Sequence, residues 1–395
     1  MFKRLINPII SDSFFLFGAR GTGKTTFLKE FFASQQVAWF DLLDPSDEDL
    51  FLRKPQEFAA RLAGLGAGSW VVIDEIQKVP KLLNIVHRLI EERKLKFALT
   101  GSSARRLKQK GINLLAGRAF TNYCFPLTHL ELGNQFSLPD ILKWGSLPRV
   151  LDLQEPLAKS AYLRSYALNY VTTEVQAEQW VRNIEPFRRF LPIAAQMNGK
   201  ILNYAKIARD VGVDTSTIIS YFDILEDTLL GFRLEGFHES VRKRQSQKPK
   251  FYIFDLGVKR AMEQTLTVEL LPQTFAFGDA FEHLVICENI RLNAYQSRDY
   301  SFSYLRTKDD VEVDLIIDRP GKKRVLVEIK SSDQISIEDC KSLINISKGL
   351  DAISVLLSRD PNPKSFENVR CLPWQDGLCQ LYPSSPGDTG LPGLL

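Results

Sequence analysis

The segment Gly18-Ala19-Arg20-Gly21-Thr22-Gly23-Lys24-Thr25 constrains this chain more than any other part of the sequence, because it fits the pattern G-x-x-x-x-G-K-[ST] at every defined position. An apolar stretch, Phe14–Phe17, precedes it, and a helical pattern, Thr26–Phe32, follows. Glycines let backbone N–H groups surround a phosphate, and the N-terminus of a helix adds its positive dipole. The segment therefore predicts a phosphate-binding loop, with the residues from Gly18 to Thr26 at the nucleotide.

A second motif indicates what happens to that nucleotide. The apolar run Trp70–Ile73 ends in the adjacent acids Asp74 and Glu75, and carboxylates at the end of a buried strand need partners. Mg²⁺, held by Asp74 and the Thr25 hydroxyl, supplies one partner, while Glu75 polarises a water for attack on the γ-phosphate. With Lys24 on the β- and γ-phosphate oxygens, the set predicts ATP hydrolysis rather than binding alone.

A third element is the strand-like segment Leu99-Thr100-Gly101-Ser102-Ser103, whose polar end is expected near the γ-phosphate. Either Thr100 or Ser102 could contact that phosphate. The alternative is that Ser102 only caps the start of a helix.

Composition excludes several classes of protein. Of 395 residues, 44% are apolar and 25% charged, which fits a globular protein of two to three domains and not a disordered or collagen-like chain. The five cysteines form no C-x-x-C pair and the four histidines complete no zinc set, so we expect reduced thiols in a cytoplasmic protein. No apolar run is long enough to span a membrane, and the N-terminal Lys3 and Arg4 precede a stretch broken by Asn7 and Pro8, unlike a cleaved signal.

The order of patterns predicts an α/β protein in several parts. Residues 1–125 alternate strands with helices such as Lys24–Phe32 and Lys81–Glu92, which indicates a parallel sheet. We expect a helical lid or linker over 126–197, a winged helix-turn-helix over 198–250, a mixed α/β domain over 251–382 and a disordered tail over 383–395. The expected strands of the first part are Phe14–Phe17, Val37–Asp41, Trp70–Ile73, Phe97–Thr100 and Ala119–Phe125.

The middle of the chain suggests contact with DNA. Tyr204–Val213 is typical of a short helix and a glycine turn, and a second helix then starts at Thr215, Ser216 and Thr217, the end that meets DNA in a helix-turn-helix. A basic segment follows, which could neutralise phosphates as a wing, although such hairpins also serve as lids or solvated loops; its cations are Arg242, Lys243, Arg244, Lys248 and Lys250. The net charge of +4 is too small to decide between these alternatives.

The C-terminal part carries an acidic set. Glu328 and Lys330 alternate along one strand and so share a face, and Asp314 is expected opposite them on a neighbouring strand, with Glu282 on the preceding helix. Carboxylates suit Mg²⁺ or Mn²⁺, and Lys330 could orient a water. The alternative is that Lys330, Arg306 or Lys308 neutralises the acids and the domain only binds or packs.

Together these phrases resemble the AAA+ ATPases, and more narrowly the prokaryotic AAA-like ATPases with a nuclease-like C-terminal domain of the PD-(D/E)XK, or restriction-endonuclease-like, superfamily. The resemblance rests on Val71–Gln77, Leu99–Ser103, Leu115–Arg118, Lys250–Tyr252, Phe254–Gly257 and Val327–Lys330. The chain departs from the pattern at Gly145–Arg149, where the family usually has Gly-Gly-Tyr-Pro and an acid.

The resemblance implies a homo-oligomer in which a neighbour completes each ATP site. An arginine then stabilises charge on the transferring phosphate, and Arg118 is the first candidate, before Arg105 and Arg106. Ordinary surface arginines are the alternative. Two functions remain open at this point, namely an ATPase that binds and cuts DNA, and an ATP-switched regulatory or scaffold protein whose nuclease-like domain is silent.

Overall fold

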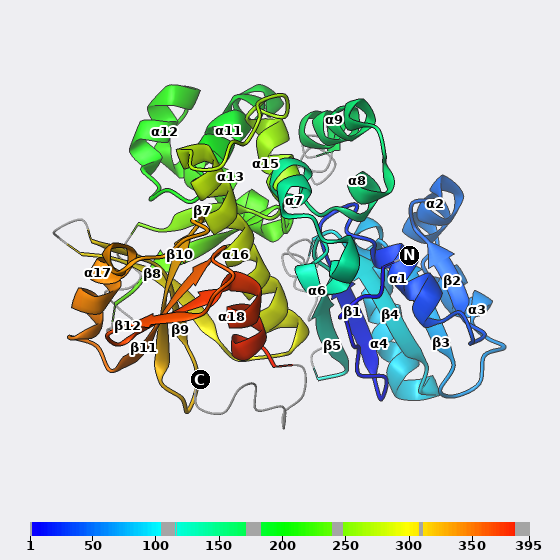
Figure 1. Ribbon diagram of the computed structural model, residues 1–395. Coiled ribbons are helices and arrows are strands. Elements are labelled where there is room, and N and C mark those ends of the chain that lie inside the picture. The colour runs from blue at the N-terminus through cyan, green and yellow to red at the C-terminus, as the bar shows by residue number, and fades with distance from the viewer. Residues whose placement is uncertain are drawn as a thin grey trace. The chain divides into compact units, whose positions relative to one another are not determined.

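The computed structural model describes residues 2–103, 115, 117–170, 183–238, 248–307 and 311–383 (Figure 1). These residues form two compact units. Unit 1 comprises Met1–Leu127, Leu147–Asp152 and Asp223–Leu230, and unit 2 comprises Thr128–Ser146, Leu153–Phe222 and Gly231–Leu395. The regions 126–197 and 198–250 each contribute residues to both units.

Unit 1 contains a five-stranded parallel sheet in the order β2-β3-β4-β1-β5. The expected strands are present within one or two residues of their predicted ends: β1 Ser13–Phe17, β2 Ala38–Asp41, β3 Trp70–Asp74, β4 Lys96–Gly101 and β5 Ala119–Tyr123. Every residue of β1 and β3 is buried, which is typical of parallel strands with both faces covered.

Helices cover this sheet, and aromatic side chains fill much of the space between. The helical elements are α1 Lys24–Phe31, α2 Pro45–Arg53, α3 Gln56–Arg61, η1 Ile76–Lys78, α4 Leu82–Arg93 and α8 Pro148–Asp152. Phe40, Phe51 and Phe58 pack edge to face at 4.9–5.8 Å between ring centroids. Such pairs stabilise a core beyond the burial of apolar area alone.

Unit 2 contains an eight-stranded mixed sheet in the order β12-β13-β11-β10-β9-β8-β6-β7. Its strands are β6 Gly231–Gly236, β7 Lys250–Ile253, β8 Ser301–Arg306, β9 Glu312–Asp318, β10 Arg324–Lys330, β11 Ala352–Ser358, β12 Lys364–Phe366 and β13 Val369–Pro373. Because β6 pairs with both β7 and β8, the strands expected for a separate wing extend the sheet that carries the acidic set.

Helices account for the rest of unit 2. The long helix predicted over Ala276–Leu292 is present as α16, Phe275–Tyr295, which is one residue longer at its start and three at its end. Within 126–170 and 183–197, the described part of the predicted lid, all named elements are helical, as expected. The other elements are α6 His129–Leu132, η2 Gly133–Gln135, α7 Leu138–Trp144, α9 Pro156–Ser165, η3 Tyr166–Tyr170, α11 Ile184–Gln196, α12 Tyr204–Val211, α13 Thr215–Asp227, α15 Leu256–Met262, α17 Ile337–Ser347 and α18 Trp374–Leu381. The end of α13, from Asp223 onward, belongs to unit 1.

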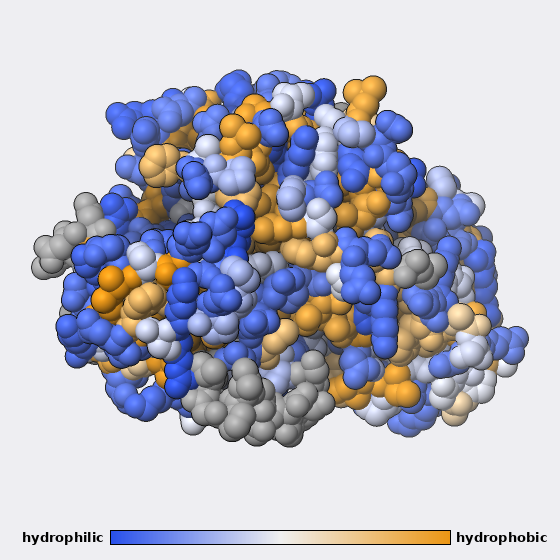
Figure 2. All heavy atoms as spheres, in the orientation of Figure 1, coloured by the Kyte–Doolittle hydropathy of each residue, from blue (hydrophilic) through white to orange (hydrophobic). Residues whose placement is uncertain are grey.

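The surface is mostly hydrophilic on the face shown in Figure 2, with apolar side chains interspersed. Among the residues that the structure describes, no helix combines the length and the apolar character needed to cross a membrane.

A buried ion pair connects α6 to α16 inside unit 2. Nδ1 of His129 lies 2.5 Å from Oε2 of Glu288, and the two side chains are 3% and 0% exposed. Burial opposes the imidazolium, but the Cys379 thiol and the Glu288 carboxylate outweigh it and raise the pKa of His129 to about 9. A charged histidine therefore stabilises the fold.

We predict a loss of stability in mild alkali that depends on His129. Its folded pKa of about 9 lies above the ordinary value of 6.5, so its contribution is complete below pH 6.5 and disappears as pH rises through 9. A shift of this size corresponds to about 3 kcal/mol. Urea unfolding of wild type and His129→Gln should differ clearly at pH 6.5 and converge near pH 10. An equal difference at both pH values would show that His129 is not charged in the fold.

Candidate functional site

The loop Gly18–Thr25 has the backbone geometry that a phosphate-binding loop needs. Gly21 and Gly23 have positive φ angles of 79° and 95°, which favour glycine. A Cβ on Gly18 would lie 2.2 Å from the carbonyl oxygen of Cys124, so only glycine fits there. Thr22 and Ala19 are buried, whereas Arg20 and Thr26 are exposed at the loop and at the first turn of α1.

Arg4 stabilises this loop from the N-terminal segment. Its guanidinium donates to the carbonyl oxygens of Thr22 (2.7 Å) and Phe125 (2.6 Å). Sequence reasoning missed this role, because Arg4 stands outside the motif and the contact depends on a residue more than a hundred positions away.

Lys24 extends from the first residue of α1 into the loop. Its side chain is 6% exposed, its ammonium donates to the carbonyl oxygens of Gly18 (2.7 Å) and Ala19 (3.3 Å), and Nζ lies 3.8 Å from Oε1 of Glu75. The cation thus lies between the loop and the proposed base, where phosphate oxygens would compete for it.

Asp74 and Thr25 are placed as a pair. The Thr25 hydroxyl donates to Oδ2 of Asp74 at 2.6 Å, and the Thr100 hydroxyl donates to Oδ1. Burial of Asp74 raises its pKa above the ordinary range for a carboxyl group. A buried carboxylate with a hydroxyl beside it is a fitting donor set for Mg²⁺, which would also favour the ionised form of Asp74.

Glu75 is held at the end of β3 in an unusual backbone conformation. Its φ of 59° lies in the left-handed region, and its N–H donates to the Thr100 hydroxyl at 2.9 Å. Its carboxylate accepts a hydrogen bond from the amide of Gln77, and the same amide nitrogen donates to the Ser102 hydroxyl at 2.8 Å. Ser102 therefore lies beside the Glu75 carboxylate. The alternative, that Ser102 caps a helix, concerns the residues that follow Ser103, which are outside the described part of the chain.

Arg118 lies at the far edge of the same sheet. It immediately precedes β5, whose first residue, Ala119, pairs with Ser13 at the start of β1, whereas the loop follows the end of β1. Its guanidinium pairs with Glu91 of α4. Five residues of strand span roughly 17 Å, so Arg118 cannot reach the loop of its own chain. Arg105 and Arg106 fall outside the described residues.

The C-terminal acids come together as the sequence predicts. The Glu328 carboxylate, 8% exposed, binds Nζ of Lys330 at 2.6 Å, and Oδ2 of Asp314 accepts from the Ile329 N–H at 2.7 Å. The β9–β10 register, continued by one residue beyond Val327–Leu315, sets Asp314 opposite Glu328. Oε2 of Glu328 is buried and has no hydrogen-bond partner.

Glu282, expected to bind the cation together with Asp314 and Glu328, instead contacts a tyrosine and a lysine. Its Oε1 accepts from the Tyr252 hydroxyl at 2.7 Å and lies 3.6 Å from Nζ of Lys250. Lys250 also pairs with Glu312, and its side chain is only 4% exposed. Lys250 is therefore a buried counter-ion and not a phosphate contact of the basic segment. The sequence reading missed Tyr252 and Glu312 as members of this cluster.

The acids remain under electrostatic strain. Burial and the charge of Glu328 raise the pKa of Asp314 well above its ordinary range, and burial and the charge of Asp314 raise the pKa of Glu282 to about 7. A cavity of about 370 Å³ opens beside them, lined by Glu282, Asp314 and Lys330 among others.

These donors fit a cation only in part. Asp314 and Glu328 offer hard oxygens, one of them unpartnered, which suits Mg²⁺ or Mn²⁺. Within the described ranges, however, no three His, Cys, Asp or Glu side chains stand together as a formed metal site.

The expected DNA-binding residues are described only in part. Thr215 and Ser216 are exposed and Thr217 is half-buried at the start of α13, after a turn in which Gly212 has a φ of 76°. Arg242, Lys243 and Arg244 lie outside the described residues. Lys248 is exposed.

The loop that departs from the family pattern has a structural role. Asp255 accepts from the N–H groups of Ser146 (2.8 Å) and Val258 (3.0 Å). Gly145 has a φ of 73°, and a Cβ there would lie 2.1 Å from Oδ1 of Asp255. Gly145 and Ser146 thus tie α7 to α15.

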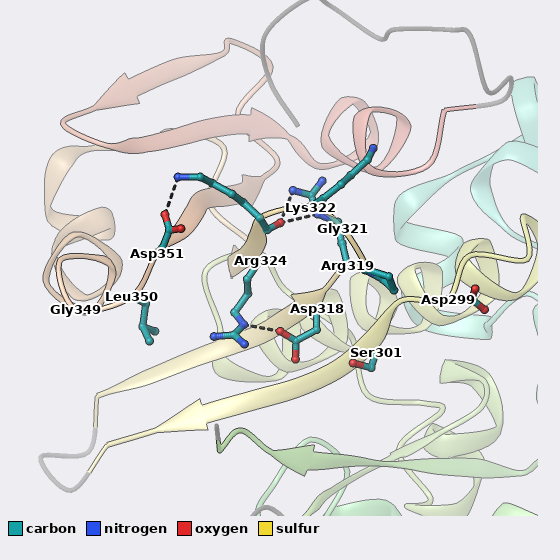
Figure 3. A pocket seen from close by; sticks show the side chains of 12 residues that line it. Asp299, Ser301, Asp318, Arg319, Gly321, Lys322, Arg324, Gly349, Leu350 and Asp351 are labelled. Atoms are coloured by element: carbon teal, nitrogen blue, oxygen red, sulfur yellow. Dashed lines mark hydrogen bonds and ion pairs between the residues drawn. The ribbon is translucent and has the colours of Figure 1, made fainter. Parts of the chain in front are cut away.

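A larger cavity, of about 770 Å³, opens at the opposite end of β10 (Figure 3). Its charges are largely matched by one another, since Arg324 pairs with Asp318 (2.5 Å) and Lys323 with Asp351 (2.6 Å). Arg319 donates to the carbonyl oxygen of Lys323. Paired charges of this kind do not indicate a ligand.

Comparison with known proteins agrees with the geometry of unit 1. Residues 11–133 match the family model described as an AAA domain. The N-terminal part of this chain is therefore similar to an AAA-type P-loop ATPase domain. Together with Lys24, Thr25, Asp74 and Glu75, the match supports binding of ATP with Mg²⁺ and its hydrolysis. Residues 135–269 and 277–376 match two models that are each described as a domain of unknown function, so the nuclease-like resemblance has no support from this comparison.

Relatives occur in bacteria and archaea. An uncharacterized protein of Mycobacterium tuberculosis is 28% identical over 78% of this chain and 68% of its own length. One from Methanocaldococcus jannaschii is 23% identical over 92% of this chain and 84% of its own. Among solved structures, a Walker-type ATPase of Pyrococcus abyssi aligns at 13% identity with a TM-score of 0.42, over 63% of this chain and 90% of that one.

The ATP site predicts two separable defects. Lys24→Ala removes the cation at the loop and should weaken ATP binding by about a hundredfold, whereas Glu75→Gln should bind ATP normally and hydrolyse it at least about a hundredfold more slowly. Equilibrium binding of a fluorescent ATP analogue and phosphate release measure the two effects. Lys29→Ala, on the same helix, is the matched control. Wild-type turnover by Glu75→Gln would refute its role as the base.

Proposed function

We propose that this protein hydrolyses ATP with Glu75 as the general base and uses that hydrolysis to control a DNA-binding, metal-dependent phosphodiesterase site in its C-terminal part. The proposal of a phosphodiesterase site is carried by the buried Oε2 of Glu328, which has no hydrogen-bond partner and lies opposite Asp314. Asp314 and Lys330 both line the neighbouring cavity. A buried carboxylate oxygen without a donor costs free energy, and a cation is the partner that would remove that cost.

In the ATPase step the residues of unit 1 act on a water and a phosphate. Lys24 would neutralise the β- and γ-phosphate oxygens, and Asp74 with Thr25 would hold Mg²⁺. Glu75 accepts a proton from the water that attacks the γ-phosphorus, and the bond to the β-phosphate oxygen breaks.

In the cleavage step Asp314 and Glu328 would hold the cation, and Lys330 would orient a water near the scissile phosphate. When bound, the cation supplies charge stabilisation and lowers the pKa of a coordinated water. Lys330 already contacts Glu328 at 2.6 Å, so its ammonium lies at the same edge of the sheet as the acids. DNA would be recruited by the start of α13, Thr215–Thr217, whose first two side chains are exposed, and by Arg242, Lys243 and Arg244.

The ion pairs of Lys250 favour a second candidate function. Because this buried lysine already binds Glu282 and Glu312, it neutralises part of the acidic cluster without a metal. In that case the C-terminal part is a silent binding or scaffold module, and ATP switches it rather than driving cleavage.

A test with metal separates the two candidates. Mn²⁺ should raise the melting temperature of wild type by several degrees and support cleavage of DNA, because it relieves the repulsion between Asp314 and Glu328. Asp314→Asn should lose both effects. Asp318→Asn, further along the same strand, should keep them and is the matched control. Equal metal responses in wild type and Asp314→Asn, without cleavage, would favour the scaffold.

The position of Arg118 predicts that ATP turnover depends on self-association of the protein. Because it cannot reach its own loop, it can act on phosphate only in a neighbouring copy. Arg118→Ala should lower turnover about tenfold or more with nearly unchanged ATP affinity, and the specific activity of wild type should fall on dilution. Full activity of a monomer at nanomolar concentration would rule this role out.

A further inference from the structure

Gln77 belongs neither to the phosphate-binding loop nor to the Asp74-Glu75 pair, yet it lies in contact with the ATP site. It lies in η1, two residues after Glu75, and is 3% exposed. Its amide nitrogen has two hydrogens and two acceptors, Oε2 of Glu75 and Oγ of Ser102, the second at 2.8 Å. One side chain thus connects the acid at the end of β3 to the hydroxyl after β4.

The chemistry of the acid fixes the orientation of this amide. A carboxylate only accepts hydrogen bonds, so the nitrogen of Gln77, and not its oxygen, must face Glu75. Ser102 therefore accepts from Gln77, and its own hydroxyl is directed to Oε2 of Glu75 over 3.4 Å, which is long for a hydrogen bond. A γ-phosphate oxygen at short range would be the better acceptor for that hydroxyl hydrogen.

Packing holds the amide in place at a cost. Oε1 of Gln77 is buried without a hydrogen-bond partner. A Cβ on Gly101 would lie 2.9 Å from this oxygen, so the glycine at the end of β4 makes room for it. An unpaired buried acceptor lowers stability, so a contribution to folding does not explain an amide at this position.

We propose that Gln77 is a positioning residue that couples the contact of Ser102 with the γ-phosphate to the orientation of the Glu75 carboxylate. The inference rests on the proposed function, in which Glu75 is the base. With Oε2 held by Gln77, Oε1 faces Lys24 at 3.8 Å, on the side of the phosphate loop. When ATP draws Lys24 to its phosphates, Oε1 is left to accept the proton of the attacking water.

The step balances without any further reactant. The water oxygen forms a bond to the γ-phosphorus, its proton passes to Oε1 of Glu75, and the electron pair of the breaking bond leaves with ADP. The hydroxyl of Ser102 and the amide of Gln77 exchange no protons. Their part is to keep the carboxylate in line.

The variant Gln77→Met tests this, because it keeps the length of the side chain and removes both N–H donors. We expect turnover to fall at least tenfold, with the affinities for ATP and ADP within twofold of wild type and an unchanged or higher melting temperature. Gln56→Met, at an exposed position of α3, is the control and should behave as wild type. Unchanged turnover in Gln77→Met would overturn the proposal.

A double-variant comparison distinguishes positioning from a separate structural effect. If Gln77 acts through Glu75, turnover of Glu75→Gln should fall no further when Gln77→Met is added, and Ser102→Ala should likewise be non-additive with Gln77→Met. Multiplied losses would refute the coupling. Should Gln77→Met fail to fold, Ser102→Ala alone must lower turnover without changing ADP affinity, or the proposal fails. Wild-type turnover by Glu75→Gln would instead refute the proposed function.

Discussion

The position of β4 between β1 and β3 is the constraint on which the ATP site depends. In a parallel sheet all strands end at one edge, so the loop after β1, the polar residues after β4 and the acids at the end of β3 meet there in that order. Thr100 consequently contacts both Asp74 and the backbone of Glu75. If β1 lay next to β3, the loop and the acids would still be adjacent, but no hydroxyl from β4 would lie between them.

In unit 2 the main electrostatic feature is a cluster of carboxylates. Four carboxylates lie close together where α16 meets β9 and β10. Two lysines form ion pairs with three of them, Lys330 with Glu328, and Lys250 with both Glu282 and Glu312. Asp314 accepts a hydrogen bond from the Ile329 N–H, and burial together with the charge of Glu328 raises its pKa well above the ordinary range. This carboxyl group lines the cavity of about 370 Å³.

Much of this could be predicted from the sequence where the determinants are local. The loop, the acids after β3 and the shared face of Glu328 and Lys330 follow from spacing alone, since strand periodicity fixes which side chains lie together. The partner of Glu282 could not be predicted, because Lys250 is some thirty residues away and was read by its charge as part of a basic segment. Gln77 was missed for a similar reason, as its importance depends on Ser102, which a separate strand supplies.

The N-terminal segment shows how a family boundary can mislead. The AAA-domain match starts at residue 11, yet Arg4 ties the carbonyl oxygen of Thr22 in the loop to that of Phe125 after β5. A shortened chain designed to begin at residue 11 would retain every motif and still lose this guanidinium. The carbonyl oxygens that it serves would then need water instead, and the loop would reach its nucleotide-ready form less often. Isolation of this domain for study should therefore keep the residues that precede the match.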